Sequence, residues 1–418
     1  MSTKVTRRQV LAGGIGALGV LAAGSLRPAG AAASANAPPV VPDRSKNAPA
    51  PPVAIQRCES YEPRLVRERL DAALALLGGI GDLVRGKTVT VKLNLTGIGD
   101  PMRGIPASRT YQVHPNVVAA LCAVLADAGA KHIYLVEGFY FRYELEDGLK
   151  PLGWDVDAIQ AAGGRRVEFE NTRNRGHFSS YANLKVPWGG YVYPAFHFNA
   201  RYEKTDVFMS LAKLKDHYCA GVTGTVKNLF GAAPQALYGD GAPDEDSIRA
   251  RIATFHNGEC RPPAGVPRDY DLTLPAGRAP WRFRVPRIVA DCLGARPVDL
   301  AILDGVETIT GGEGPWIDGV EIAAPKLLIV GRNAVCTDSV TAGVQGYNPN
   351  ADHLKYPFQG ENHLRLLAQA GVGSNDLARI EVRGVSIDKA KFPFHAPTDA
   401  AATACGHRHV YEHMVRTV

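Results

Sequence analysis

The chain has seven cysteines but no Cys-x-x-Cys pair. The usual zinc and iron-sulfur sites take their ligands from closely spaced cysteines. The absence of such cysteine pairs argues against an iron-sulfur cluster, and no metal site is predicted. Cys122 and Cys336 fall in segments with helical patterning, which predicts that both are small core residues. The cofactor, if there is one, is not identified by the sequence.

A phosphate-binding loop of the form GxxxxGK[ST] is also absent, so the Gly-rich stretches do not indicate a particular nucleotide. The formal charge of +6 includes four basic residues and no acidic residue from the segment 1–35. The rest of the chain is therefore close to neutral. Nothing in that balance predicts a nucleic-acid partner.

No apolar run reaches the roughly 20 residues that a membrane-spanning helix needs. The run from Val10 to Ala23 is shorter and follows the pair Arg7-Arg8, and small residues at 31–35 offer cleavage sites. This pattern predicts a twin-arginine (Tat) signal peptide over residues 1–35. We expect export by the Tat translocase to the periplasm or the extracellular space and no stable membrane span. An uncleaved membrane anchor is the alternative.

A Pro-rich linker is predicted over residues 36–54 and one α/β domain over 55–390. Within that domain, residues 232–284 are rich in Gly, Pro, Asp and Arg and are predicted to be an insertion, part of which forms a lid or a binding loop, because so long a plain connection is unusual. The tail 391–418 contains four histidines. Terminal histidines are usually solvated, so they are not assigned to a site.

Five apolar strands should end at Leu93, Val136, Leu211, Leu303 and Val330, with helical patterns separating them. Strands joined through helices lie parallel, so the fold class is α/β, a mainly parallel sheet with flanking helices in a three-layer, Rossmann-like arrangement with inserted loops. The aromatic-rich segment 184–198 carries Gly189-Gly190 at its centre. It is predicted to form a small β hairpin.

The stretch from Asp206 to Gly231 is the centre of the predicted site. After a strand ending at Leu211 it places Lys213, Lys215 and His217, which are hard to bury unpaired. Gly221 and Gly224 then mark a turn, and Thr223 or Thr225 could cap a helix. That helix would carry Lys227 and Asn228. A helix N-terminus beside three ammonium groups favours an anion, whereas a surface turn with solvated lysines is the alternative.

Other polar groups follow neighbouring strands. Lys92 and Asn94 lie at the end of one strand, Asp304 follows another, and Glu313 lies among three glycines a few residues later. Ligands of α/β sheets bind at the carboxyl ends of the strands, so these residues should meet Lys213 and His217 at one edge. We expect the Glu313 loop to close over them. A tight surface turn is the alternative for that loop.

Several of these motifs together resemble the domain-of-unknown-function family 362, over about residues 85–385. The Lys213–His217 and Lys227–Gly231 pieces are the most specific. The motifs occur at 91–94, 114–118, 128–130, 213–217, 221–231, 304–306, 312–315 and 337–340. Some relatives in this family carry a four-cysteine ferredoxin-type segment, which this chain lacks. The resemblance implies a fold and a site but no substrate.

Two functions fit these observations. In the first, the protein is an exported enzyme on a small anionic molecule. His217 would be the acid or base, Glu313 or Asp304 the proton-transfer or metal group, and the lysines the anchors for charge. In the second, the same pocket holds a ligand or cofactor without catalysis, as in a redox accessory module, and the acidic loop is structural.

Overall fold

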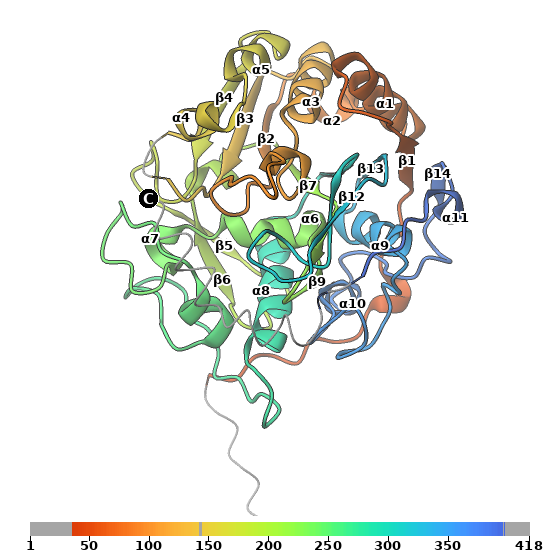
Figure 1. The fold of residues 1–418 in the computed structure, drawn as a ribbon. Coiled ribbons are helices and arrows are strands. Elements are labelled where there is room, and N and C mark those ends of the chain that lie inside the picture. Colours follow the sequence, from red (N-terminus) through yellow and green to blue (C-terminus); the bar gives the residue numbers. More distant parts are fainter. Residues whose placement is uncertain (1–35, 142–143, 396, 398–418) are drawn as a thin grey trace, which may run out of the picture. The chain divides into compact units, whose positions relative to one another are not determined.

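Eight strands form one sheet in the computed structural model, which describes residues 36–141, 144–395 and 397 (Figure 1). Across the sheet the strands are β14 (Val382–Gly384), β1 (Val53–Arg57), β13 (Leu327–Gly331), β10 (Leu300–Gly305), β7 (Val207–Lys213), β2 (Thr88–Lys92), β3 (His132–Glu137) and β4 (Val167–Asn171). The five strands from β10 to β4 are parallel, which confirms the predicted fold class.

The prediction that β13 lies parallel to its neighbours is wrong. The strand runs antiparallel to β10 and also to β1, although it was expected among the parallel strands. A parallel neighbour needs a crossover, usually through a helix, and the connection between β10 and β13 contains only the hairpin of β11 (Thr308–Thr310) and β12 (Glu321–Ala323). A connection without a helix returns the chain in the opposite direction.

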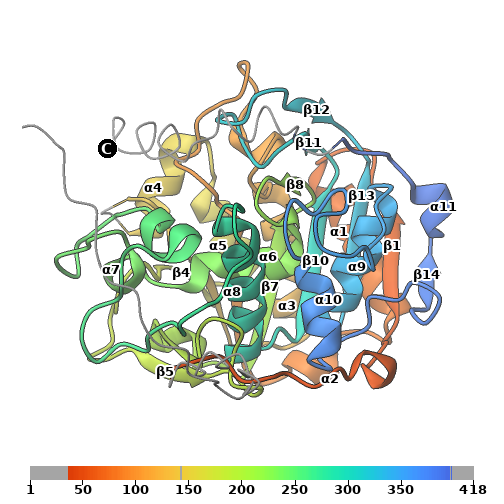
Figure 2. The same ribbon diagram turned by 90° about the horizontal axis from the view of Figure 1, so that it is seen from below.

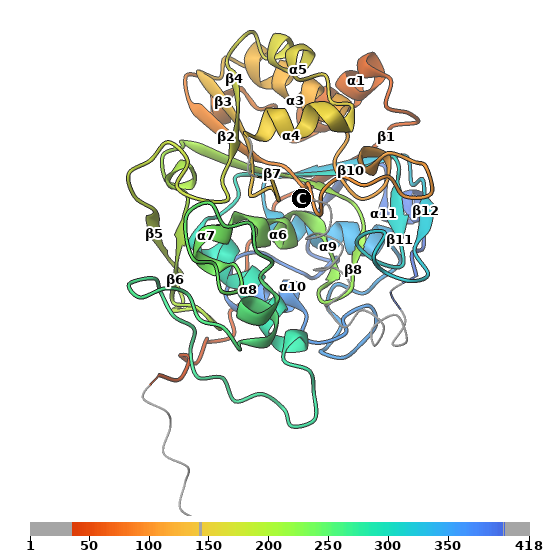
Figure 3. The ribbon, with the colours of Figure 1, turned by 60° about the vertical axis from the view of Figure 1, so that its left-hand side comes forward.

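Helices cover both faces of the sheet, as Figure 3 shows. One layer comprises α1 (Pro63–Leu76), α2 (Gly81–Val84), α3 (Pro115–Asp127), α4 (Leu145–Leu149) and α5 (Val156–Ala162). The other contains α6 (Gly224–Lys227), α8 (Trp281–Ala295), α9 (Ala334–Val344) and α10 (His363–Gln369), and α10 packs against both α8 and α9 (Figure 2). The architecture is therefore three-layered, as predicted.

Strand β7 shows how the sequence produces these layers. All seven of its residues are buried, which is typical of a parallel strand covered on both faces. Met209 and Leu211 belong to the hydrophobic core beneath α1 and α3, whereas Phe208 and Ala212 belong to the core beneath α8 and α9. The alternation of side chains along the strand thus supplies both cores.

The helix ends follow local signals in the sequence. Helix α1 has Pro63 in its first turn, and the Glu62 carboxylate accepts hydrogen bonds from two backbone N–H groups there. His114 plays the same part before Pro115, because its Nδ1 accepts the N–H of Asn116. His114 is therefore a capping residue, as predicted.

The smaller elements lie outside the main sheet. The predicted hairpin is present as β5 (Ala182–Lys185) and β6 (Ala195–Phe198), which form a two-stranded sheet of their own. The segment 232–284 contains α7 (Gln235–Tyr238), a π-helical turn over Ile252–Asn257 and the first residues of α8. The remaining strands and α-helix are the hairpin of β8 (Asp216–His217) and β9 (Gly221–Val222), and α11 (Ile387–Ala390).

Strand β1 was not predicted, and it takes in the last two residues of the segment 36–54. No helix of the described part of the chain is long and apolar enough to cross a membrane. The predicted signal peptide and three of the four tail histidines lie outside the described residues.

Candidate functional site

A cavity of about 130 Å³ opens at the carboxyl ends of β2 and β3. Residues that follow these strands and β7 form one side of it, and residues 250–252 and His256 of the segment 232–284 form another. Seven of the predicted site residues line this cavity. They are Lys92, Asn94, His217, Thr223, Lys227, Asn228 and Glu313.

Of the lysines and arginines that line the cavity, Lys227 and Arg251 have no ion-pair partner among the described residues, and the Arg251 Nη1 donates to the Ala233 carbonyl at 2.8 Å. The Lys227 ammonium lies 4.4 Å from the centroid of the Phe230 ring, and the Arg251 guanidinium lies 5.3 Å from the same centroid. Arg251 is 4% exposed, and its Nε has no hydrogen-bond partner in the described part of the chain. Two cations held over one ring leave positive charge facing the cavity.

Burial lowers the pKa of Lys227 to about 8. Desolvation is the largest cause, and the nearby Arg251 guanidinium acts in the same direction. Cys219, Glu313 and Cys292 oppose the shift. An anion bound beside Lys227 would raise this pKa again, because it would stabilise the ammonium form.

Lys92 lines the cavity but already has its acceptors. Its ammonium pairs with the Glu137 carboxylate and donates to the Leu93 carbonyl. Asn228 holds the adjacent strand ends together by donating to the Lys92 carbonyl and to the Ser210 hydroxyl. Glu137 accepts from the backbone N–H of Leu95 as well. Lys92 and Asn228 thus build the cavity wall rather than offer free donors.

Glu313 and His217 both line the cavity, and Glu313 is bonded to the residue that follows His217. The Glu313 carboxylate accepts the Tyr218 N–H at 2.9 Å and the Trp316 indole N–H at 3.3 Å. His217 accepts the Cys219 N–H at its Nδ1, so its neutral ring carries the proton on Nε2. Desolvation, followed by the charges of Lys227 and Lys215, holds the pKa of His217 well below its usual value.

Lys215 lies behind the Glu313 loop and does not line the cavity. Its ammonium donates to the carbonyls of Tyr111 and Glu313 at 2.7 and 3.0 Å. Burial lowers the pKa of Lys215 to about 7, against the opposing charge of Glu313. This lysine fixes the position of the loop that carries Glu313.

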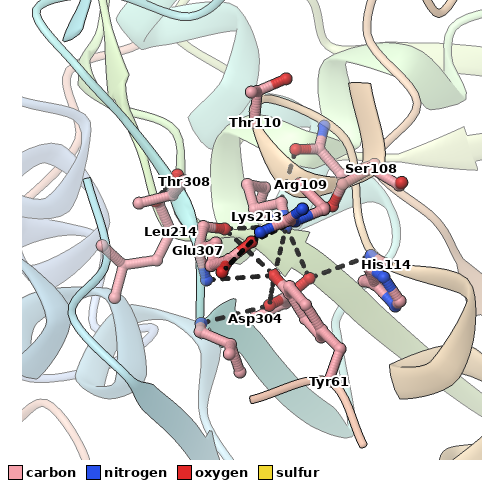
Figure 4. Close-up of polar contacts among 12 residues, drawn as sticks. Tyr61, Ser108, Arg109, Thr110, His114, Lys213, Leu214, Asp304, Glu307 and Thr308 are labelled. Atoms are coloured by element: carbon pink, nitrogen blue, oxygen red, sulfur yellow. Dashed lines mark hydrogen bonds and ion pairs between the residues drawn. The ribbon is translucent and has the colours of Figure 1, made fainter. Parts of the chain in front are cut away.

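Lys213 and Asp304 form a separate buried cluster, drawn in Figure 4. Their charged groups lie 2.8 Å apart, both side chains are fully buried, and Lys213 also donates to Tyr61 and to the carbonyls of Ser108 and Glu307. Asp304 accepts in addition from the His114 backbone N–H. Neither residue lines the cavity, so the structure does not bring them into one site with Lys227.

The N-terminus of α6 is occupied by the protein itself. The Asp338 carboxylate accepts the backbone N–H groups of Thr225 and Val226 and the Thr225 hydroxyl, each at 2.8 Å. Thr223 makes no side-chain cap and donates instead to the Asp216 carbonyl. The expected external anion at this helix terminus is therefore replaced by an internal carboxylate, which also supplies the partner that a buried Asp338 needs.

The glycines of this stretch serve close packing. A Cβ at Gly224 would lie 2.3 Å from the Asp338 carboxylate, and one at Gly221 would lie 2.7 Å from the Phe358 ring. Both residues have positive φ angles. Gly221, Gly224 and Thr225 do not line the cavity, so they position α6 rather than contact a ligand.

Several cavity residues were not predicted. Glu137 ends β3 at the predicted edge, and its position after an apolar strand was the available signal. Arg251 and His256 come from the segment 232–284, where no sequence spacing relates them to Lys227. Tyr218, Phe230 and Trp316 contribute aromatic rings to the lining. Within the described ranges, no group of three or more His, Cys, Asp or Glu side chains is arranged to hold a metal ion.

The fold and this cavity define the class of protein: a three-layer α/β protein with a positively charged cavity at the carboxyl edge of its parallel strands. The chain belongs to the family described as Domain of unknown function (DUF362), which matches residues 89–343. That match includes both the Lys213–Asp304 pair and all of the residues that line the cavity.

Two individual comparisons add less. A thylakoid-associated protein of Synechocystis sp. is 30% identical over 183 residues, which are 44% of this chain and 50% of that protein. The chain thus spans about half the length of this relative. A crystal structure of a Thermotoga maritima protein aligns with 61% of this chain and 52% of its own, with 14% identity and a TM-score of 0.33.

Proposed function

We propose that this chain is an exported protein that binds a small anionic molecule or cofactor in the cavity beside Lys227. The observation that carries the proposal is the Lys227 ammonium itself. It has no hydrogen-bond or ion-pair acceptor among the described residues, and it lies over the same ring as the Arg251 guanidinium. Both groups are cationic and partly desolvated, and the Arg251 charge lowers the pKa of Lys227, so an anion bound near them would stabilise both charges.

The cavity's own acidic groups do not satisfy this charge. Glu137 is paired with Lys92, and the Glu313 carboxylate is engaged by two uncharged donors. Both carboxylates therefore have fixed positions of their own. A ligand that supplies one or two negative charges would complete the set.

Enzymatic turnover is supported by the presence of His217 and Glu313 in the same lining. Asp304 has no part in such turnover, because it is buried beside Lys213 and does not line the cavity. The alternative, a non-catalytic ligand- or cofactor-binding module such as a redox accessory protein, is favoured by the engagement of both Glu313 oxygens with the Tyr218 and Trp316 donors. A carboxylate held in this way organises its loop.

Binding can be tested directly by isothermal titration calorimetry with lactate and with inorganic phosphate. Replacing Lys227 by alanine should weaken binding by about 1 to 3 kcal/mol, the range for losing a charge-assisted hydrogen bond. Lys131→Ala is the matched control, because Lys131 is exposed just before β3. Equal affinities for the wild type and Lys227→Ala would contradict the proposal. Mass spectrometry of the natively purified, exported protein would identify a co-purified ligand.

A further inference from the structure

Four lysines near the strand ends differ in how their ammonium groups are held. Lys92, Lys213 and Lys215 each donate to at least two acceptors of the protein. Lys227 has no such acceptor in the described part of the chain, and its half-buried side chain borders the cavity. A lysine that the fold places in a cavity without an acceptor is available to react with what enters.

The surroundings of Lys227 favour its neutral amine. Its nitrogen lies against the Phe230 ring and near the Arg251 guanidinium, a partly apolar site with a second cation. With a pKa of about 8, roughly a tenth of the Lys227 side chains are neutral at pH 7, far more than for a solvated lysine. Desolvation and a neighbouring cation are the two conditions that activate nucleophilic lysines.

Arg251 offers a carboxylate site beside this amine. Its side chain is buried and borders the cavity; its Nη1 donates to the Ala233 carbonyl at 2.8 Å, whereas its Nε has no hydrogen-bond partner among the described residues. A guanidinium binds a carboxylate through parallel N–H donors. The 130 Å³ cavity is comparable with the cavity of about 150 Å³ that accepts a benzene ring, so it has room for a carboxylate of a few carbon atoms.

We propose that Lys227 forms an imine with a small 2-oxo acid whose carboxylate is bound by Arg251. This inference rests on the proposed function, since it names the ligand class of the same cavity. The neutral Lys227 amine adds its lone pair to the keto carbon, the C=O π bond breaks, and one of the two amine protons is transferred to the carbonyl oxygen. The resulting carbinolamine then loses that oxygen as water while the nitrogen loses its remaining proton. The step releases one water and changes no oxidation state.

Groups for the proton transfers line the same cavity. The neutral His217 ring carries a proton on Nε2, and Glu313 presents a carboxylate. Dehydration of a carbinolamine needs a proton for the departing hydroxyl. These two residues are the candidates for that proton transfer.

Reductive trapping tests the inference. The full chain is incubated with pyruvate or glyoxylate, reduced with sodium borohydride and digested, and the peptides are analysed by mass spectrometry. The peptide with Lys227 should gain the mass of the 2-oxo acid less one oxygen atom, more than tenfold above the same adduct at exposed Lys131. Lys227→Arg is the key control, because it keeps the positive charge but cannot form the imine.

The outcomes separate the two proposals when calorimetry with lactate is run in parallel. Lactate resembles pyruvate but has no carbonyl carbon to attack. If lactate binds, and its affinity drops in Lys227→Ala, while neither 2-oxo acid labels Lys227 above Lys131, then the imine is wrong and anion binding stands. If neither lactate nor phosphate binds and no adduct forms, both proposals fall.

Discussion

Lys227 and Lys213 come from the same stretch of chain, yet their surroundings give them opposite roles. Lys213 is enclosed by a carboxylate, a phenol and two carbonyls, so it stabilises the junction of β7 and β10. Lys227 faces an open cavity with another cation beside it. What a lysine can do is decided by the acceptors around its nitrogen, and these come from distant segments.

Anion binding should depend on pH through Lys227. In the protein without ligand, the pKa of Lys227 is about 8, so this side chain is largely charged at pH 6 and loses its proton as the pH rises through 8. A bound anion raises that pKa, so affinity should be constant well below pH 8 and fall above it, by up to about tenfold per pH unit. Lactate calorimetry between pH 6 and 9 measures this.

Lys227→Arg supplies the control for that profile, because arginine stays charged throughout the range. The pKa of His217 lies well below its usual value, so this ring stays neutral over the same interval. A profile that falls equally in the wild type and in Lys227→Arg would assign the effect to another group.

Removing only one partner of the Lys213–Asp304 ion pair should strongly destabilise the folded protein. Lys213→Met leaves the Asp304 carboxylate buried without its cation, which should lower the free energy of unfolding by about 3 to 5 kcal/mol. Adding Asp304→Asn removes the uncompensated charge, so the double variant should lose less than the sum of the two single variants. Urea unfolding of the four proteins tests the coupling, and strict additivity would show that the pair is not coupled.

At the scale of elements, the turn before α6 depends on Gly224. A Cβ there would meet the Asp338 carboxylate, and the φ angle is +55°. Gly164 also has a positive φ, +64°, but a Cβ there would meet no atom within 4 Å. Gly164→Ala should therefore cost about 1 kcal/mol of stability, and Gly224→Ala distinctly more, because it also displaces Asp338.

Thermal unfolding of the two alanine variants compares these costs. The stronger loss for Gly224→Ala should be accompanied by weaker lactate binding, since α6 carries Lys227. Equal losses of stability in the two variants would mean that the contact with Asp338 is unimportant.

Most elements could be predicted because their signals are local. Pro63 and Pro115 open helices that end before glycines, and the short apolar runs of β2, β3 and β7 mark strands of the central sheet. The direction of β13 could not be predicted in the same way. It depends on the connection from β10 to β13, which contains no helix, whereas helices separate the parallel strands.

The site was predictable only in part, for a related reason. Lys92, Asn94 and His217 were found because each follows a strand, and such residues meet at one edge of the sheet. The same rule also selected Lys213 and Asp304, which end their strands but turn to each other instead. Arg251 lies in a segment without regular patterning, and its approach to Lys227 is a long-range contact that no local signal encodes.

At the scale of the whole molecule, the proposed export rests on the twin-arginine pair. Replacing Arg7 and Arg8 together by lysine keeps the charge but removes the pair that the translocation receptor reads. We expect a reporter fused to the signal segment to remain in the cytoplasm. Fractionation of cells with the wild-type and double-lysine fusions measures this, and unchanged export would refute the signal assignment.

The central claim, an anion between Lys227 and Arg251, is tested most directly by locating one. Crystals of the mature protein soaked in selenate should show an anomalous selenium peak in the cavity, with oxygens within hydrogen-bond distance of the Lys227 ammonium and the Arg251 Nε. The peak should vanish in Lys227→Ala crystals. Selenate bound only at exposed basic residues, with Lys227 bonded to a carbonyl or carboxylate of the protein, would contradict the account.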